Sequence, residues 1–355
     1  MTAGDIGGSG RNSSYYTDTN LPPNFYRVTT TDYNGVGNIN FNRGHLCPSE
    51  DRTDTTNDNK LVFFMSNIMP QSALNNQGVW GNFEGFCQGA TSTNEMLIIC
   101  GGSGFGTNTL PSGKAFMPSN TWKVVVCVPL GSGTALSRIA ITNRVIAISI
   151  PNVTNGLSSS WQTYATSPRK VELDTGFTFF TALPANIATV FRAKIDGYPA
   201  PSITAFSPVN GNAGGTVTIT GTNFSTASTV WFNGTNAAFT VNSDLQITAT
   251  VPAGAASGKI SVVASGGLAT SAANFIVTAT NPPAITPSFS LLTFTNNQFQ
   301  FTITGTAGSN YVVQASTNLT APNWIPQKTN AAPFVFIQSN ANLFNQRFYR
   351  ALVNP

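Results

Sequence analysis

Three segments follow one another early in the chain: Asn42-Arg43-Gly44-His45-Leu46-Cys47-Pro48-Ser49-Glu50-Asp51-Arg52, then Leu61-Val62-Phe63-Phe64-Met65-Ser66-Asn67-Ile68, then Asn75-Asn76-Gln77-Gly78-Val79-Trp80-Gly81-Asn82-Phe83-Glu84. This stretch holds His45, the only histidine among 355 residues. Imidazole is the side chain best matched to proton transfer near neutral pH. Placed beside Arg43, Gly44 and nearby carboxylates, His45 is a candidate general base. A packed or surface histidine is the plainer interpretation.

The same stretch predicts a strand, a second strand and a helix. Phe41 to Leu46 is typical of a strand end, and Leu61 to Ile68 is an apolar run short enough for a buried strand. Asn75 is the expected cap of the helix that follows. Within that helix Asn76 and Glu84 are separated by roughly 12 Å of axial rise, too far to be joint direct ligands of one ion. Glu84 would then act through water bound to the ion.

This unit resembles the core of the DNA/RNA non-specific endonuclease family, the ββα-metal or His-Me finger nucleases. The matching elements are Asn42 to His45, Ser66 to Gln71, and Asn76 through Trp80 to Glu84. The resemblance runs from Arg11 to about Gly197, and its further matching segments are Pro118 to Lys123, Ile148 to Asn152, and Glu172 to Gly176. It implies an α+β nuclease domain that hydrolyses phosphodiester bonds of DNA and RNA.

The resemblance also assigns the chemistry around a divalent ion. His45 is the implied general base and Asn76 the one direct protein ligand of the ion. Glu84 holds water bound to that ion. The implied cofactor is Mg²⁺, with other divalent ions such as Mn²⁺ as alternatives.

Four further residues receive supporting roles from the resemblance. Arg11 falls where the family keeps a phosphate-contacting arginine, and Arg43 would also stabilise charge on the transition state. Asn42 and Asn67 are expected to support the residues that contact the metal and the substrate, without contacting either directly.

Two departures from the family pattern are expected to matter. Asn42 replaces the usual aspartate, which removes a charge next to the base and predicts a slower enzyme. The chain also begins just ahead of Arg11, where the family normally has another strand, so we expect an N-terminally truncated product with an exposed sheet edge.

Composition sets broad limits on the class of protein. The length predicts two or three domains, and 41% hydrophobic residues argue against disorder. Net charge is only +4, with thirteen Lys and Arg against twelve Asp and Glu in residues 1–200. Nucleic acid would therefore be held by a few placed arginines, with modest affinity and a shallow salt dependence.

Neither the cysteines nor any targeting signal identifies the cellular compartment of the protein. Cys47, Cys87, Cys100 and Cys127 lack zinc-site spacing, and one or two disulfides in any of three pairings are compatible with them. A Cys47 nucleophile paired with His45 is disfavoured, because side chains so close along one segment crowd each other and would form a catalytic pair only by accident. No apolar run reaches transmembrane length and no signal peptide is visible. The resemblance favours an extracellular or periplasmic protein.

The remainder of the first domain, residues 1–199, is predicted to complete a central sheet with the catalytic helix on one face. Met96 to Cys100, Trp122 to Val128 and Arg144 to Ile150 are predicted strands, and Trp161 to Val190 has mixed helical spacing. Gly197 to Pro201 is the predicted linker.

Residues 200–280 change to short alternating runs that predict an immunoglobulin-like β-sandwich. Thr216 to Thr220, Val230 to Gly234 and Lys259 to Val263 are the expected strands. Four segments resemble the IPT/TIG domain: Ser207-Pro208, Gly214-Gly215-Thr216, Gly221 to Phe224 and Ala273 to Phe275. Such modules serve as spacers, adhesion units or carbohydrate contacts.

A second proline-rich linker, Asn281 to Pro287, leads to an all-β module at residues 281–355. Phe299 to Ile303, Tyr311 to Ala315 and Arg347 to Ala351 are its predicted strands. A surface or carbohydrate ligand is one expectation for the two β modules. Trp231 and Trp324 could stack on sugars, although single tryptophans in small sandwiches are more often core residues.

Two functions from different classes follow. The favoured function is a metal-dependent, sequence-non-specific endonuclease. The alternative is a secreted adhesion or surface-binding protein with an impaired nuclease head, which the Asn42 replacement and the two appended β modules would favour.

Overall fold

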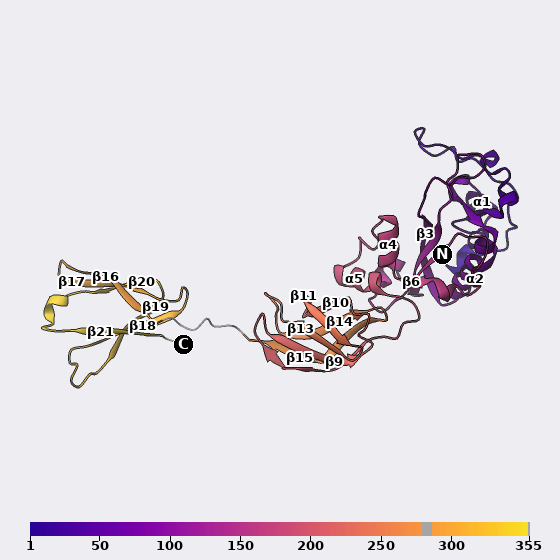
Figure 1. Cartoon of the computed structure of the whole chain (residues 1–355). Helices are drawn as coiled ribbons and strands as arrows, with labels where there is room; N and C mark the ends of the chain where they lie inside the picture. Colours follow the sequence, from indigo (N-terminus) through magenta and orange to yellow (C-terminus); the bar gives the residue numbers. More distant parts are fainter. Residues whose placement is uncertain (279–285, 354–355) are drawn as a thin grey trace. The chain divides into compact units, whose positions relative to one another are not determined.

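The computed structural model describes residues 1–278 and 286–353, and the chain forms two compact units, Met1–Thr278 and Ala279–Pro355 (Figure 1). Most of the second predicted linker and the predicted boundary at residue 280 lie outside the described residues. None of the helices in the described residues has the length and apolar character needed to cross a membrane.

The N-terminal part of the first unit, residues 1–199, is built on two sheets and several short helices. The small sheet pairs two antiparallel strands, and the larger sheet has the order β3-β4-β5-β6. The strands are β1 (Phe41–His45), β2 (Ile68–Ser72), β3 (Asn94–Ser103), β4 (Asn120–Pro129), β5 (Arg144–Pro151) and β6 (Ala165–Thr166). The α-helices are α1 (Thr56–Leu61), α2 (Gly81–Ala90), α3 (Ala135–Arg138), α4 (Pro168–Thr175) and α5 (Ala185–Ala193). A π-helix spans Asn75–Trp80, and single 3₁₀ turns span Ala3–Asp5, Thr30–Tyr33, Val36–Ile39, Ser49–Asp51, Met65–Asn67 and Trp161–Tyr164.

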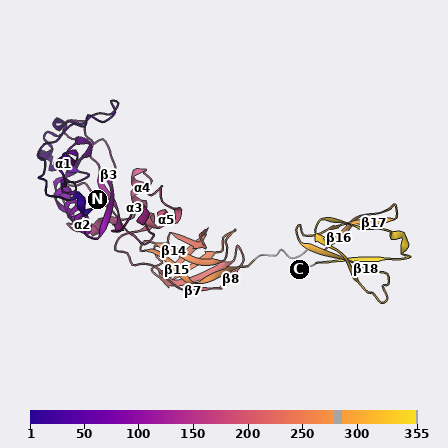
Figure 2. The same ribbon diagram turned by 180° about the vertical axis from the view of Figure 1, so that it is seen from behind.

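Helices cover both faces of the larger sheet, with α2 on one side and α4 and α5 on the other (Figures 1 and 2). Strand β4 explains why, because its residues 121–128 are all buried. Val125 and Cys127 pack in the cluster that includes α2, whereas Val124 and Val126 pack in clusters with α4 and α5. A strand buried on both faces reads as a continuous apolar run, and that run made it recognisable in the sequence. The predicted α+β domain is confirmed, and α2 packs on one face of the larger sheet.

The predicted strand at Leu61 to Ile68 is wrong. Leu61 ends α1, and only Ile68 belongs to a strand, β2. The side chain of Asn67 donates hydrogen bonds to the carbonyl oxygens of Val62, at 2.8 Å, and Cys47, at 2.9 Å, which bends the segment. Val62, Phe63 and Met65 are buried in a loop and a 3₁₀ turn, so periodicity alone could not distinguish this run from a strand.

The predicted helix cap at Asn75 is also wrong. The hydroxyl of Ser72 accepts the backbone N–H of Asn75 at 3.1 Å, three residues along, as an N-cap residue does. The Asn75 side chain is instead buried and donates to Thr121 Oγ1 at 3.0 Å and to the Pro151 carbonyl at 3.2 Å. It therefore ties the start of the helical segment to the larger sheet.

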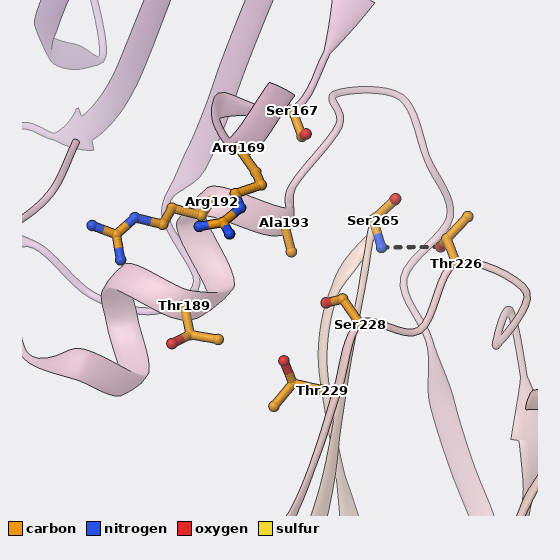
Figure 3. A pocket seen from close by; sticks show the side chains of 9 residues that line it. All are labelled: Ser167, Arg169, Thr189, Arg192, Ala193, Thr226, Ser228, Thr229 and Ser265. Carbon is orange, nitrogen blue, oxygen red and sulfur yellow. Dashed lines mark hydrogen bonds between the residues drawn. The ribbon is translucent and has the colours of Figure 1, made fainter. Parts of the chain in front are cut away.

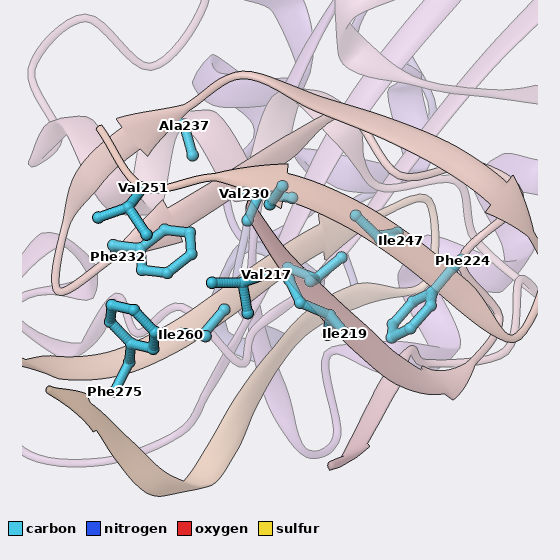
Figure 4. Close-up of a cluster of buried hydrophobic side chains, with 12 residues drawn as sticks. Val217, Ile219, Phe224, Val230, Phe232, Ala237, Ile247, Val251, Ile260 and Phe275 are labelled. Atoms are coloured by element: carbon cyan, nitrogen blue, oxygen red, sulfur yellow. The ribbon is translucent and has the colours of Figure 1, made fainter. Parts of the chain in front are cut away.

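Residues 202–277 form an immunoglobulin-like sandwich of two sheets, ordered β11-β10-β14-β15-β8 and β12-β13-β9-β7. The strands are β7 (Ser202–Ser207), β8 (Asn210–Gly211), β9 (Thr216–Thr222), β10 (Thr229–Phe232), β11 (Thr235–Ala237), β12 (Phe239–Ser243), β13 (Gln246–Thr250), β14 (Gly258–Ala264) and β15 (Gly267–Val277). Alternate residues point inward to one core, shown in Figure 4, in which Val217 and Ile219 of β9 face Phe232 and Phe275. The predicted sandwich is confirmed.

The C-terminal unit is also all-β. One sheet has the order β16-β17-β20 and the other β19-β18-β21. The strands are β16 (Ser288–Thr295), β17 (Gln298–Thr304), β18 (Asn310–Ser316), β19 (Ile325–Ala331), β20 (Phe334–Gln338) and β21 (Phe348–Val353), with a 3₁₀ turn at Ala341–Leu343. Both sheets contribute to one apolar core, including Phe301 and Phe336 from the first and Tyr311 and Val313 from the second.

Candidate active site

His45 ends β1 and is held in an aromatic environment. Its ring is only 8% exposed and lies edge-on to Phe63, with 4.8 Å between the ring centroids. Tyr15 lies 5.7 Å away on another side. The His45 Nε2 atom is buried and forms no hydrogen bond with the described residues. Buried polar atoms in native structures nearly always have a partner, so this nitrogen is available to accept a hydrogen bond from water or substrate.

The electrostatic surroundings keep His45 neutral. Burial lowers the pKa of His45, the nearby guanidinium of Arg11 lowers it further, and Glu50 partly opposes both, giving a pKa of about 4. The imidazole is therefore uncharged at neutral pH, which is the state that a general base requires.

Arg11 and Arg43 both lie beside the aromatic rings that surround His45. The Arg11 guanidinium is 5.1 Å from the centroid of Phe63 and forms an exposed ion pair with Glu50 at 3.2 Å. The Arg43 guanidinium is 5.2 Å from the Tyr15 ring. Arg43 Nη2 donates to the Thr30 carbonyl at 3.3 Å, whereas its buried Nε has no partner among the described residues. Two cations thus converge near the candidate base.

The opposite face of β1 carries further unpaired polar atoms. Asn42 is the cross-strand neighbour of Gln71, and both Asn42 Nδ2 and Gln71 Oε1 are buried without a hydrogen bond to the described residues. Gln71 lies directly over Gly44, where an added Cβ would come within 1.9 Å of Gln71 Oε1. A glycine is therefore required between Arg43 and His45 for this packing.

Asn67 has a structural position in this arrangement. Its side chain accepts the backbone N–H of Cys47 at 3.0 Å in addition to its two donated bonds. It thus fixes the chain immediately after His45. Burial raises the pKa of Cys47, which keeps that thiol protonated and argues against a nucleophilic Cys47.

Asn76 sits in the irregular turn that precedes α2. Residues Asn75–Trp80 form a π-helix with a kink at Gly78, where φ is −101° and ψ is −108°. The Asn76 side chain is half-buried and forms no hydrogen bond with the described residues. π-Helical segments often occur at functional sites. The Asn76 amide is therefore free to bind a ligand.

Glu84 forms an ion pair with a buried lysine that the sequence did not predict. Lys123 Nζ lies 2.9 Å from Glu84 Oε1, and the Lys123 side chain is 2% exposed. Lys123 also lies 4.4 Å from the Trp80 ring centroid. Burial raises the pKa of Glu84, while the neighbouring ammonium opposes that rise. A lone lysine in the apolar run Trp122 to Val128 was the signal that could have revealed this pair, since buried lysines are almost always paired.

The four cysteines are all free thiols. Cys100 is the cross-strand partner of Lys123, and its Sγ contacts the Leu46 carbonyl at 3.2 Å. Burial raises the pKa of Cys100 to about 11 and that of Cys87 to about 12. These thiols therefore behave as buried apolar groups.

The residues near this site suit a hard cation held largely by water and phosphate. No group of three or more His, Cys, Asp or Glu side chains in the described residues could hold a metal ion. The amide oxygens of Asn76 and Gln71 and the carboxylate of Glu84 are oxygen donors, the type that Mg²⁺ prefers. Mg²⁺ also retains several waters and commonly uses substrate phosphates as ligands. The half-buried Asn76 amide, which forms no hydrogen bond with the described residues, is consistent with such a site.

A separate pocket of about 450 Å³ contains none of the predicted site residues. Figure 3 shows Thr189 on one side of it and Ser228 and Thr229 on the other. Its Arg192 is already paired with Glu172 at 2.9 Å, and its Arg169 lies 3.7 Å from the same carboxylate. The pocket is therefore distinct from the His45 site.

Comparison with known proteins finds relatives for the two parts of the first unit. The family model for DNA/RNA non-specific endonuclease matches residues 1–186, and the model for the IPT/TIG domain matches residues 201–280. A nuclease from Nostoc sp. is 37% identical over 191 residues, which cover 54% of this chain and 68% of that protein. Mitochondrial endonuclease G from Bos taurus is 26% identical over 157 residues, covering 41% of this chain and 52% of that protein.

A solved EndoG/EndoGI complex aligns with a TM-score of 0.43 at 17% identity, covering 52% of this chain and 78% of that one. The chain spans about half the length of the mitochondrial relatives it matches. The first family model covers more than half of the chain. The chain therefore belongs to the DNA/RNA non-specific endonuclease family.

Proposed function

We propose that this protein is a metal-dependent endonuclease that hydrolyses phosphodiester bonds of DNA and RNA without sequence specificity. The observation that carries the proposal is the neutral, buried His45 with an unpaired Nε2 and with two arginines on the aromatic rings beside it. Family membership supplies the substrate class, and Arg11 and Arg43 beside His45 supply cations suited to phosphate rather than to bases.

In the proposed reaction, His45 removes a proton from the attacking water. The resulting hydroxide attacks phosphorus in line, and the 3′ oxygen leaves. Arg11 and Arg43 would stabilise the additional negative charge on the phosphate, because both guanidinium groups lie near the aromatic rings that contact His45. General-base and electrostatic contributions of this kind are each worth on the order of 10² to 10³ in rate.

Asn76 would hold a divalent ion, proposed to be Mg²⁺, directly through its amide oxygen, and Glu84 would hold it through water. When bound, such an ion neutralises charge on the leaving oxygen. Lys123 fixes one oxygen of Glu84 at 2.9 Å, which leaves the second oxygen for water. Asn42 and Asn67 would support these residues without contacting the ion, and Asn67 would do so by fixing the backbone at Cys47.

The test is degradation of supercoiled plasmid and of RNA by the purified full chain, with Mg²⁺ and with EDTA. We expect cleavage of both substrates only with the ion, and loss of at least 10² in rate for His45→Ala, because the chain has no second histidine. More than a few per cent residual activity in a folded His45→Ala variant would rule out the general-base role. Absence of cleavage by the wild type would favour the alternative, an adhesion or surface-binding protein. We also propose an extracellular or periplasmic location, which cell fractionation would test.

A further inference from the structure

The C-terminal unit carries positive charge without any carboxylate side chain. Lys328, Arg347 and Arg350 are its basic residues, and no aspartate or glutamate occurs after Asp244. No ion pair therefore involves these three cations among the described residues of the unit. This differs from residues 1–200, where acidic and basic residues are nearly balanced.

Each of the three cations lies over an aromatic ring. The Arg350 guanidinium is 4.6 Å from the Trp324 ring centroid, and that of Arg347 is 4.1 Å from Phe344. Lys328 Nζ is 5.6 Å from Phe334. Trp324 is only half-buried, so the expectation that it is a core residue is wrong. A ring beneath a guanidinium holds that cation by cation–π attraction without neutralising it.

The two arginines are oriented by glutamines on the neighbouring strands β18 and β19. Arg350 Nε donates to Gln314 Oε1 at 2.8 Å, and Arg347 Nη2 donates to Gln327 Oε1 at 2.8 Å. Gln314 pairs across the sheet with Pro326, the neighbour of Gln327, so both guanidinium groups reach the same region of the β19-β18-β21 sheet. Neutral amides orient these cations but leave their charge uncompensated.

A pocket of about 280 Å³ opens beside Arg347. Hydroxyl and amide side chains line it together with Phe344, and they include Ser316, Thr317 and Asn318. The buried Nε of Arg347 forms no hydrogen bond with the described residues. A buried donor without a partner, in a pocket with hydroxyl and amide groups, is suited to an anionic oxygen.

We propose that this face of the C-terminal unit, formed by Trp324, Phe344, Arg347 and Arg350, binds single-stranded nucleic acid. Phosphates would contact the guanidinium groups, and bases would stack on the aromatic rings and arginine planes, the combination that non-specific single-strand binding uses. The inference rests on the proposed nucleic-acid substrate: the unit would retain the strands that the nuclease part acts on.

The test uses the full chain carrying His45→Ala, in EDTA, so that the strand is not cut. Binding of a short fluorescein-labelled oligo-dT is followed by fluorescence anisotropy over a range of salt concentrations. We expect Arg347→Gln and Arg350→Gln each to weaken binding several-fold and to reduce the slope of log affinity against log salt by roughly 0.7, the value for one phosphate contact on a single strand. Trp324→Leu should weaken binding roughly tenfold with the slope unchanged.

Lys259→Gln is the matched control, because it removes one exposed charge from the immunoglobulin-like sandwich. Equal effects of Lys259→Gln and the two arginine variants would overturn the proposal. So would tighter binding of polygalacturonate than of oligo-dT, since that result would make the face a site for anionic polysaccharide. Arg350→Lys, which keeps the charge, should retain the salt slope if Arg350→Gln fails to fold. Binding that persists in a chain with no plasmid cleavage would sink the nuclease function and leave this inference standing.

Discussion

Lys123 and Glu84 form an ion pair that joins the middle of the larger sheet to the helix of the candidate active site. Their Nζ and Oε1 atoms are 2.9 Å apart, and the two side chains are 2% and 15% exposed. Burial lowers the pKa of Lys123, but the Glu84 carboxylate and neighbouring thiols outweigh it, so that the pKa is raised overall. Both groups therefore stay charged where little water reaches them, and each charge is compensated by the other.

Removing one member of this pair should be costly. Lys123→Met leaves the Glu84 carboxylate buried without a counter-ion, which typically lowers the free energy of unfolding by about 3–5 kcal/mol. Urea unfolding measures this loss. Lys170→Met is the control, because Lys170 pairs with Asp174 on an exposed surface and should change stability by less than about 1 kcal/mol. The double variant Lys123→Met with Glu84→Gln should recover part of the loss, and a double variant no more stable than the single one would contradict this account.

The sequence predicted the order of the ββα unit, strands β3, β4 and β5 of the larger sheet and the β modules, because these depend on local periodicity; it did not predict the short strand β6. It did not predict Lys123 as the partner of Glu84, since 39 residues separate them and only the fold brings them together. It also misplaced the helix start and the strand at Leu61 to Ile68. In both places an asparagine side chain bonds to a backbone carbonyl at least 20 residues away, and such tertiary hydrogen bonds leave no periodic signal.

The depressed pKa of His45 predicts a pH-dependent contribution to stability. The folded-state pKa is about 4, against about 6.5 for an unperturbed histidine. Because the unfolded chain takes up the proton first as the pH falls, this contribution is fully present above about pH 6.5 and is lost progressively down to about pH 4. The difference corresponds to about 3 kcal/mol.

His45→Phe isolates this contribution, since a phenyl ring can pack against Phe63 and Tyr15 without titrating. Denaturant unfolding of both proteins between pH 4.5 and 7.5 provides the measurement. The wild type should lose stability relative to the variant as the pH falls. Parallel curves would show that His45 is not buried in its neutral form.

Asn76→Ala should raise the Mg²⁺ concentration needed for half-maximal cleavage and lower the maximal rate. One direct protein ligand leaves the ion otherwise held by water and phosphate, so no other side chain compensates for its loss. The free energy of unfolding, measured by thermal unfolding, should be unchanged within about 0.5 kcal/mol, because the Asn76 side chain forms no hydrogen bond with the described residues. Asn82→Ala, which removes a bond to the Ser159 carbonyl from the same helical segment, is the control. A Mg²⁺ titration of Asn76→Ala that matches the wild type would rule out the ligand role.

Asn42→Asp tests the residue that departs from the family pattern. The Asn42 Nδ2 donor is buried without a partner, and the adjacent Gln71 Oε1 acceptor is also unpaired, so the amide is not locked into a network of its own. A carboxylate at this position would remove an unsatisfied donor and restore the negative charge that retains a hydrated cation. We expect higher activity, with the largest gain at limiting Mg²⁺, where an added charge most improves retention of the ion. Cleavage rates of both forms across a Mg²⁺ titration decide the question, since superimposable curves or a slower Asn42→Asp enzyme would mean that asparagine is adapted to this site.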